Sequence, residues 1–149
     1  MSPVWFGLKV AASALVVLAT QDARWAHAQT GGPEQAERLA RGGYIVDRVA
    51  QCGRCHTPAD KYGHRDATRR LMGGPLDVEP TIAKDEWAMA APRLAGTPPG
   101  TDEEFVRLMM TGISRTGRKP LRPMPQFLMT QQDAESVLEY LKSLRTDRR

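Results

Sequence analysis

Cysteine is scarce in this chain of 149 residues, and several features that mark common classes of protein are missing. The two cysteines, Cys52 and Cys55, lie too close together for a disulfide bond between them to staple distant segments. No segment repeats with a period of about 20 to 50 residues, which excludes solenoid architectures. The net charge is only +4 and no block of like charges occurs, so nothing in the composition indicates binding to nucleic acid.

Large aromatic side chains are also few. From Gln29 onward the chain has these six: Tyr44, Tyr62, Trp87, Phe105, Phe127 and Tyr140. For a domain of this size they form a thin set of large core side chains, so we expect another large apolar group to occupy the centre. No alternating run of β-branched residues occurs, and the proline- and glycine-rich segments are expected to be loops. The expected fold class is therefore all-α.

The apolar run near the N-terminus is short. It covers Val10–Ala19 and ends before Asp22, whereas a membrane-spanning helix needs about 20 apolar residues. The small-x-small pattern Ala26–Ala28 follows, as at a secretory cleavage site. We therefore expect residues 1–28 to be a signal peptide and residues 29–149 to be one exported, periplasmic domain. The alternative is an uncleaved leader that anchors the protein to the membrane.

A first amphipathic helix is predicted directly before the cysteines. Pro33 suits the first position of a helix, where its missing N–H costs nothing. Small and apolar residues then recur at i, i+4, i+7 and i+11 among charged ones. These residues are Leu39, Gly43, Val46 and Ala50.

Two further helices are predicted after residue 100. Thr101 can cap one of them while Glu104 reaches back, and that helix is expected to end at Gly112. Its apolar face consists of Phe105, Leu108 and Met109. Thr130 can cap the other with Asp133 three residues on. Its apolar stripe consists of Ala134, Val137, Leu138 and Leu141.

The two cysteines and the next histidine form the pattern Cys-x-x-Cys-His. Two thiols one helical turn apart can each add across a haem vinyl group, and the following residue then directs its imidazole at the iron. The sequence therefore predicts one haem c, attached through thioether bonds to Cys52 and Cys55, with His56 as proximal iron ligand. A haem would also supply the large apolar group that the aromatic residues do not.

Two other uses of closely spaced cysteines compete with this interpretation. A structural zinc site needs four ligands, and from Gln29 onward the cysteine and histidine candidates are only Cys52, Cys55, His56 and His64. A thioredoxin-type pair would open a helix after a buried strand, whereas the residues before Cys52 have helical period. Zinc binding and thiol exchange both stay open as alternatives.

A haem iron has a second axial position, for which Met124 is the preferred candidate. Pro123 and Pro125 flank it, and their fixed φ angles keep its thioether on a stiff loop, away from any helix face. The predicted iron ligands are therefore His56 and Met124. Five other methionines are expected to act as flexible core fillers. They are Met72, Met89, Met109, Met110 and Met129. His64 is expected to be exposed, with bis-histidine ligation as the alternative.

From about Gly42 to Leu144 the chain resembles class I (monohaem) c-type cytochromes. It is most similar to periplasmic cytochromes and cytochrome subunits that serve dehydrogenases. The stretch 42–58 resembles their first helix and attachment motif, and "LMGGPL" resembles their glycine-rich loop. "TGISRTGRKPLRPMPQF" resembles their axial-methionine segment, and "VLEYLKSL" their last helix. The resemblance implies a small cytochrome c fold with about three to five helices wrapped around one covalently bound haem.

In that family the first and last helices cross closely through a glycine and aromatic residues. The resemblance assigns Gly43 and Tyr44 to one side of the crossing, and Tyr140 and Leu141 to the other. One departure is visible at residues 92–94, which read Pro-Arg-Leu where relatives often have Pro-Asn-Leu. This calls into question the polar contact that the asparagine makes.

The resemblance implies an electron carrier and not an enzyme. It would shuttle single electrons between a periplasmic dehydrogenase and an acceptor such as an oxidase or another cytochrome. The competing function is a haem-based small-ligand sensor or enzyme whose sixth position is open or displaceable. We expect no nucleic-acid partner, and membrane association only if the leader is retained. Partners are expected to meet an exposed haem edge with a rim of basic residues. This rim includes Arg54, Lys61, Lys119 and Arg122.

Overall fold

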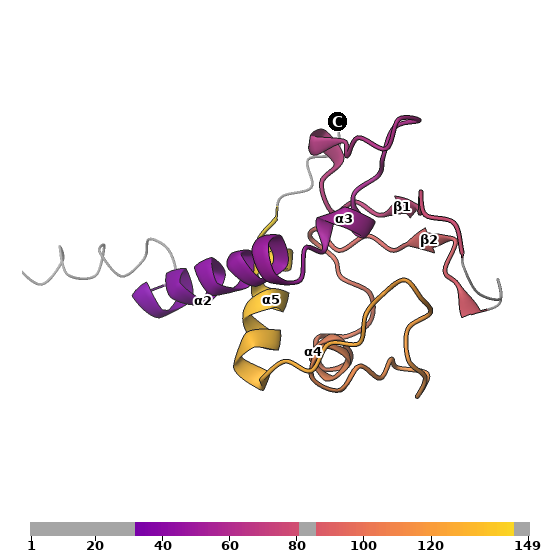
Figure 1. Ribbon diagram of the computed structural model, residues 1–149. Helices are drawn as coiled ribbons and strands as arrows, with labels where there is room; N and C mark the ends of the chain where they lie inside the picture. The colour runs from indigo at the N-terminus through magenta and orange to yellow at the C-terminus, as the bar shows by residue number, and fades with distance from the viewer. Residues whose placement is uncertain (1–31, 81–85, 145–149) are drawn as a thin grey trace, which may run out of the picture. The chain divides into compact units, whose positions relative to one another are not determined.

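The described part of the computed structural model consists of residues 32–80 and 86–144, and its elements are shown in Figure 1. They are α2 (Pro33–Tyr44), a π-helical turn η1 (Ile45–Val49), α3 (Gly53–His56), a 3₁₀ turn η2 (Ala67–Arg69), β1 (Gly74–Pro75), β2 (Ala90–Ala91), α4 (Asp102–Thr111) and α5 (Gln131–Ser143). The expected signal peptide 1–28 lies outside these residues. Among the described helices, none has the length and apolar character needed to cross a membrane.

The predicted caps of α4 and α5 are confirmed. The Thr101 hydroxyl accepts a hydrogen bond from the Glu104 backbone, and the Glu104 carboxylate accepts one from the Thr101 backbone. The helix ends at Gly112, whose φ of 68° is in the left-handed region that glycine adopts without strain. Thr130 caps α5 by accepting from the Asp133 backbone. Both helices therefore begin where their own side chains satisfy the first N–H groups, and α4 ends at the predicted glycine.

The hydrophobic core forms where α5 packs against the other helices. The four residues of its predicted stripe are all buried, as expected from their helical spacing. They join a cluster contributed by η1, α4 and the loops between. This cluster includes Ile45, Val46, Leu71, Leu94, Phe105 and Met109. The core thus lies on the inner faces of the helices whose apolar stripes were predicted.

The close crossing of α2 and α5 is present, but the glycine at its centre is Gly42. A Cβ atom on Gly42 would lie 2.0 Å from the Ser136 carbonyl oxygen, whereas one on Gly43 would lie 3.0 Å from the Tyr140 ring. Tyr44 is 56% exposed, so its predicted place in the crossing is wrong. The two helices therefore approach most closely at Gly42. Figure 1 shows the crossing of α2 and α5.

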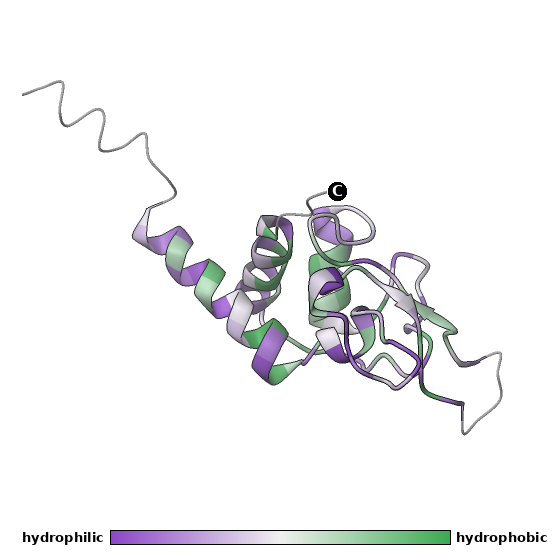
Figure 2. Ribbon diagram, turned by 90° about the horizontal axis from the view of Figure 1, so that it is seen from above, coloured by the Kyte–Doolittle hydropathy of each residue, from purple (hydrophilic) through white to green (hydrophobic). Residues whose placement is uncertain are grey.

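The predicted stripe reaches Val46, which is buried, and Ala50, which packs against the core, through the π-helical turn η1. The Ala50 N–H donates to the Ile45 carbonyl at 2.8 Å, and the Cys52 N–H donates to the Val46 carbonyl at 3.0 Å. The wider turn buries Ile45 together with Val46 and shifts the later residues around the helix. Gln51 then has a φ of 50°, so the chain leaves the helix sharply before Cys52. The alternating polar and apolar residues of α2 and η1 can be followed in Figure 2.

The described chain is mainly helical, but it also contains one short two-stranded sheet that was not predicted. Strands β1 and β2 pair antiparallel through Gly74 with Ala91 and Pro75 with Ala90. No β-branched pattern predicts these strands, because their pairing depends on the close approach of the backbone at Gly73 to residues 91–93. A Cβ on Gly73 would lie 2.6 Å from the Arg93 nitrogen, and Gly73 has a φ of 73°. The pairing brings the loop after β2 against the segment that follows His56.

Candidate functional site

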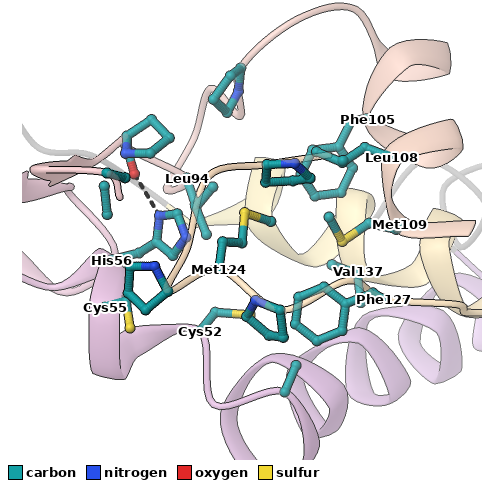
Figure 3. Close-up of a pocket in the computed structure, with 18 of the residues that line it drawn as sticks. Cys52, Cys55, His56, Leu94, Phe105, Leu108, Met109, Met124, Phe127 and Val137 are labelled. Atoms are coloured by element: carbon teal, nitrogen blue, oxygen red, sulfur yellow. Dashed lines mark hydrogen bonds between the residues drawn. The ribbon is translucent and has the colours of Figure 1, made fainter. Parts of the chain in front are cut away.

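An apolar cavity of about 360 Å³ lies beside the helices and brings the predicted site residues together. Cys52, Cys55, His56 and Met124 all line it, although Met124 lies 68 positions from His56 in the sequence. Most of the remaining wall is hydrophobic, as Figure 3 shows for Leu94, Phe105, Leu108, Phe127 and Val137. A volume of this size is in the range of pockets that enclose organic ligands, about 300 to 1000 Å³.

His56 is buried, with 7% of its surface exposed, and one of its ring nitrogens has a fixed partner. Nδ1 lies 2.7 Å from the Pro92 carbonyl oxygen. Because a carbonyl only accepts hydrogen bonds, Nδ1 carries the proton. Burial lowers the pKa of His56, against the opposing effect of the Pro92 carbonyl, so the imidazole is neutral at neutral pH. A neutral ring protonated at Nδ1 leaves the Nε2 lone pair available to a metal.

Cys52 directly precedes the short helix α3, and Cys55 lies within it. Its first turn is closed by the hydrogen bond from the His56 N–H to the Cys52 carbonyl at 2.9 Å. Burial raises the pKa of the Cys52 thiol to about 11. The thiolate that zinc ligation or thiol exchange requires is therefore disfavoured at Cys52. An uncharged thioether fits the same apolar wall.

No group of three or more His, Cys, Asp or Glu side chains arranged to bind a metal ion occurs within residues 32–80 and 86–144. This gives no support to the zinc alternative.

Met124 reaches the cavity from a loop that is tied to the chain around residues 86–88. The Arg122 N–H donates to the Glu86 carbonyl at 3.1 Å, and the Ala88 N–H donates to the Arg122 carbonyl at 2.6 Å. Met124 itself is half-buried, and Figure 3 shows its side chain in the cavity that His56 and Cys52 also line. The role of Met124 as an iron ligand stays a prediction.

Two of the other methionines, Met109 and Met129, line the same cavity as Met124. Met109 is buried in the core, and Met72, Met110 and Met129 pack against it as expected. Met89 is 67% exposed, so its expected role as a core filler is wrong. The His64 side chain is 81% exposed, and its Nδ1 lies 3.3 Å from Asp60. His64 does not line the cavity, which gives no support to the bis-histidine alternative.

Several functional contacts around His56 were not predicted. The Pro92 carbonyl carries no signal in its side chain, and its hydrogen bond joins residues 36 positions apart. Thr57 accepts a hydrogen bond from the buried Leu71 N–H at 3.0 Å, and the Gly73 N–H donates to the His56 carbonyl at 2.8 Å. Arg93, at the position where the resemblance leads us to expect asparagine, donates from Nε to the Ala95 carbonyl at 2.7 Å.

Comparisons with known proteins relate part of this chain to c-type cytochromes. No protein-family model matches it. It is 43% identical over 51 residues to a diheme cytochrome c-type protein of Cereibacter sphaeroides, covering 30% of this chain and 17% of that protein. It is 27% identical over 120 residues to a nicotinate dehydrogenase subunit of Pseudomonas putida, covering 75% of this chain and 9% of that subunit. The chain therefore spans only a small part of either relative, and the similarities point to electron transfer.

Proposed function

We propose that this chain is a periplasmic electron-transfer protein of the class I type, with one haem c bound through Cys52 and Cys55. The observation that carries the proposal is the apolar cavity lined by both cysteines, His56 and Met124. The donor set fits a haem, because it offers a neutral imidazole, two half-buried cysteine sulfur atoms and a thioether. When bound there, a haem supplies an iron that accepts and releases one electron.

The residues that line the cavity suit an electron carrier better than an enzyme that acts on a substrate. Pro92 holds the orientation of His56, and the two prolines beside Met124 restrict its loop. The hydrophobic wall excludes water from the site. If His56 and Met124 both held the iron, no coordination position would be left for a substrate. Thioether ligation also favours Fe(II) and raises the reduction potential relative to two histidines.

The proposal includes export and a dehydrogenase partner. Residues 1–28 would direct the chain to the periplasm, where haem is attached to the domain 29–149. The similarity to a segment of a nicotinate dehydrogenase subunit supports a dehydrogenase as electron donor. An oxidase or another cytochrome would accept the electron. Membrane association would require a retained leader.

Carbon monoxide tests this function against that of a ligand sensor or haem enzyme. If Met124 occupies the sixth position, the reduced protein should bind carbon monoxide slowly and incompletely. The Soret band measures this directly. Prompt and complete binding by the wild type would mean an open or easily displaced sixth position, and the electron-carrier proposal would be wrong.

The surface around Met124 supports an acidic redox partner. Segment 112–130 contains no acidic residue, and its exposed basic residues form no ion pair with another described residue. These residues are Arg115, Arg118, Lys119 and Arg122. Lys119 and Arg122 line a surface hollow together with Met124, and Arg54 lines another with Cys55. Lys61 lines neither of these hollows, so its predicted place on the rim has less support.

Charge reversal tests this surface. The double variant Lys119→Glu and Arg122→Glu is expected to slow electron transfer with an acidic partner by about tenfold at low ionic strength, because electrostatic steering is lost. The rate should also depend less steeply on salt. Stopped-flow kinetics across a salt series measures both effects. Arg107→Glu, on the exposed side of α4, is the matched control and should change the rate less. Equal rates for wild type and the double variant would rule out this surface.

A further inference from the structure

The loop that carries Met124 covers the C-terminal end of α4. The last carbonyl groups of a helix have no partner within it and need one from elsewhere. Here the Gln126 side chain donates from Nε2 to the Thr111 carbonyl at 2.9 Å. The Met129 N–H donates to the Met109 carbonyl at 2.9 Å. Two of the last carbonyl groups of α4 therefore accept hydrogen bonds from the loop that carries Met124.

Gly112 provides the space that the Gln126 contact needs. A Cβ atom on Gly112 would lie 1.9 Å from Gln126 Cγ and 2.6 Å from its Nε2. The left-handed φ of 68° at Gly112 also favours glycine. The Gln126 side chain thus lies directly over the residue that ends α4.

Met124 consequently lies between two anchors only four residues apart. On its N-terminal side Arg122 is bonded to Glu86 and Ala88 through the backbone, and on its C-terminal side Gln126 is bonded to Thr111. Pro123 and Pro125 restrict the residues in between. A short, restricted segment fixed at both ends holds its central side chain in place more firmly than one fixed at a single end.

We propose that Gln126 is a positioning residue for the axial methionine. Its amide N–H, bonded to Thr111, keeps the Met124 sulfur in the cavity. This inference rests on the proposed function, in which Met124 is an iron ligand. The net contribution of one such hydrogen bond corresponds to about a three- to tenfold change in an equilibrium constant. Its loss should increase by that factor the fraction of molecules in which Met124 has left the iron.

Three substitutions separate the donor function of Gln126 from simple packing. Gln126→Leu keeps the size and removes the donor. Gln126→Glu replaces the donor with a carboxylate that faces the Thr111 carbonyl at the negative end of α4. Gln126→Lys keeps a donor that this end of the helix favours. Because Gln126 is exposed, none of them opens a cavity in the core. Gln131→Leu is the control, since Gln131 is exposed and its Nε2 donates to Glu135 on α5.

The readout is the rate at which the reduced, haem-loaded protein binds carbon monoxide, with the reduction potential as a second measurement. We expect the rate to rise about three- to tenfold in Gln126→Leu and further in Gln126→Glu. Gln126→Lys and Gln131→Leu should match the wild type. If the wild type shows sulfur ligation but the Leu and Glu variants bind carbon monoxide at its rate, this proposal alone is wrong. If the wild type shows no sulfur ligation, the proposed function fails and this proposal fails with it.

Discussion

Replacing Met124 with alanine is expected to abolish the weak red-region absorption band that marks sulfur ligation of ferric haem. The substitution removes the thioether from the cavity and leaves Cys52, Cys55 and His56 unchanged. The haem should therefore remain covalently attached. The reduction potential should fall by on the order of 0.1 V, because the thioether that favours Fe(II) is lost. Absorption spectroscopy and redox titration measure both changes, and the variant should also bind carbon monoxide rapidly.

Three other methionines serve as controls for this experiment. Met72→Ala, Met89→Ala and Met129→Ala should each keep the red-region band. Loss of the band in one of them, with the band intact in Met124→Ala, would contradict the assignment. Persistence of the band in all four variants would transfer the assignment to Met109 or Met110. A bis-nitrogen spectrum in the wild type that is lost in His64→Ala would make His64 the ligand.

Replacing Gly42 with alanine is expected to destabilise the haem-loaded protein by about 2 to 3 kcal/mol, because the added methyl group forces α2 and α5 apart. The new Cβ would lie 2.0 Å from the Ser136 carbonyl oxygen and 2.6 Å from its carbon, and neither backbone atom can rotate away. Helix propensity alone predicts the opposite sign, since alanine is favoured over glycine inside a helix by about 1 kcal/mol. Denaturant unfolding measures the difference.

The neighbouring glycine provides a matched control. A Cβ on Gly43 would meet only the ring of Tyr140, at 3.0 to 3.4 Å, and this side chain can move. Gly43→Ala should therefore change the free energy of unfolding by about 1 kcal/mol or less. If Gly42→Ala were as stable as the wild type, the two helices would not cross as closely as described.

The parts of the fold that could be predicted from the sequence depend on local chemistry. Thr101 with Glu104, and Thr130 with Asp133, satisfy the first N–H groups of their own helices, so sequence spacing alone locates the caps. The stripe of α5 was equally clear, because every third or fourth residue faces the core. The Cys-x-x-Cys-His pattern alone identifies three of the residues that line the cavity.

The unpredicted parts depend on contacts between distant backbone segments. Gly42 and Gly43 are adjacent, and the choice between them depends on the helix register against α5. The Pro92 carbonyl that bonds His56 lies directly after β2, which pairs with β1, and two-residue strands leave no periodic pattern. Met89 is exposed because it lies in the loop just before β2, although its side chain alone favours the core. For Gly42 and for His56 the deciding partner lies far away in the sequence.

The central claim is that Cys52 and Cys55 hold one haem, and the mass of the exported protein tests it most directly. Expression in a periplasm with haem-attachment machinery should give a red protein whose mass exceeds that of the chain Gln29 to Arg149 by one haem. The haem should resist extraction by acidified acetone, since thioether bonds are covalent. The double variant Cys52→Ser and Cys55→Ser is the control and should carry no haem after extraction. Wild-type protein that releases its haem on extraction, or that shows no Soret band, would contradict the claim.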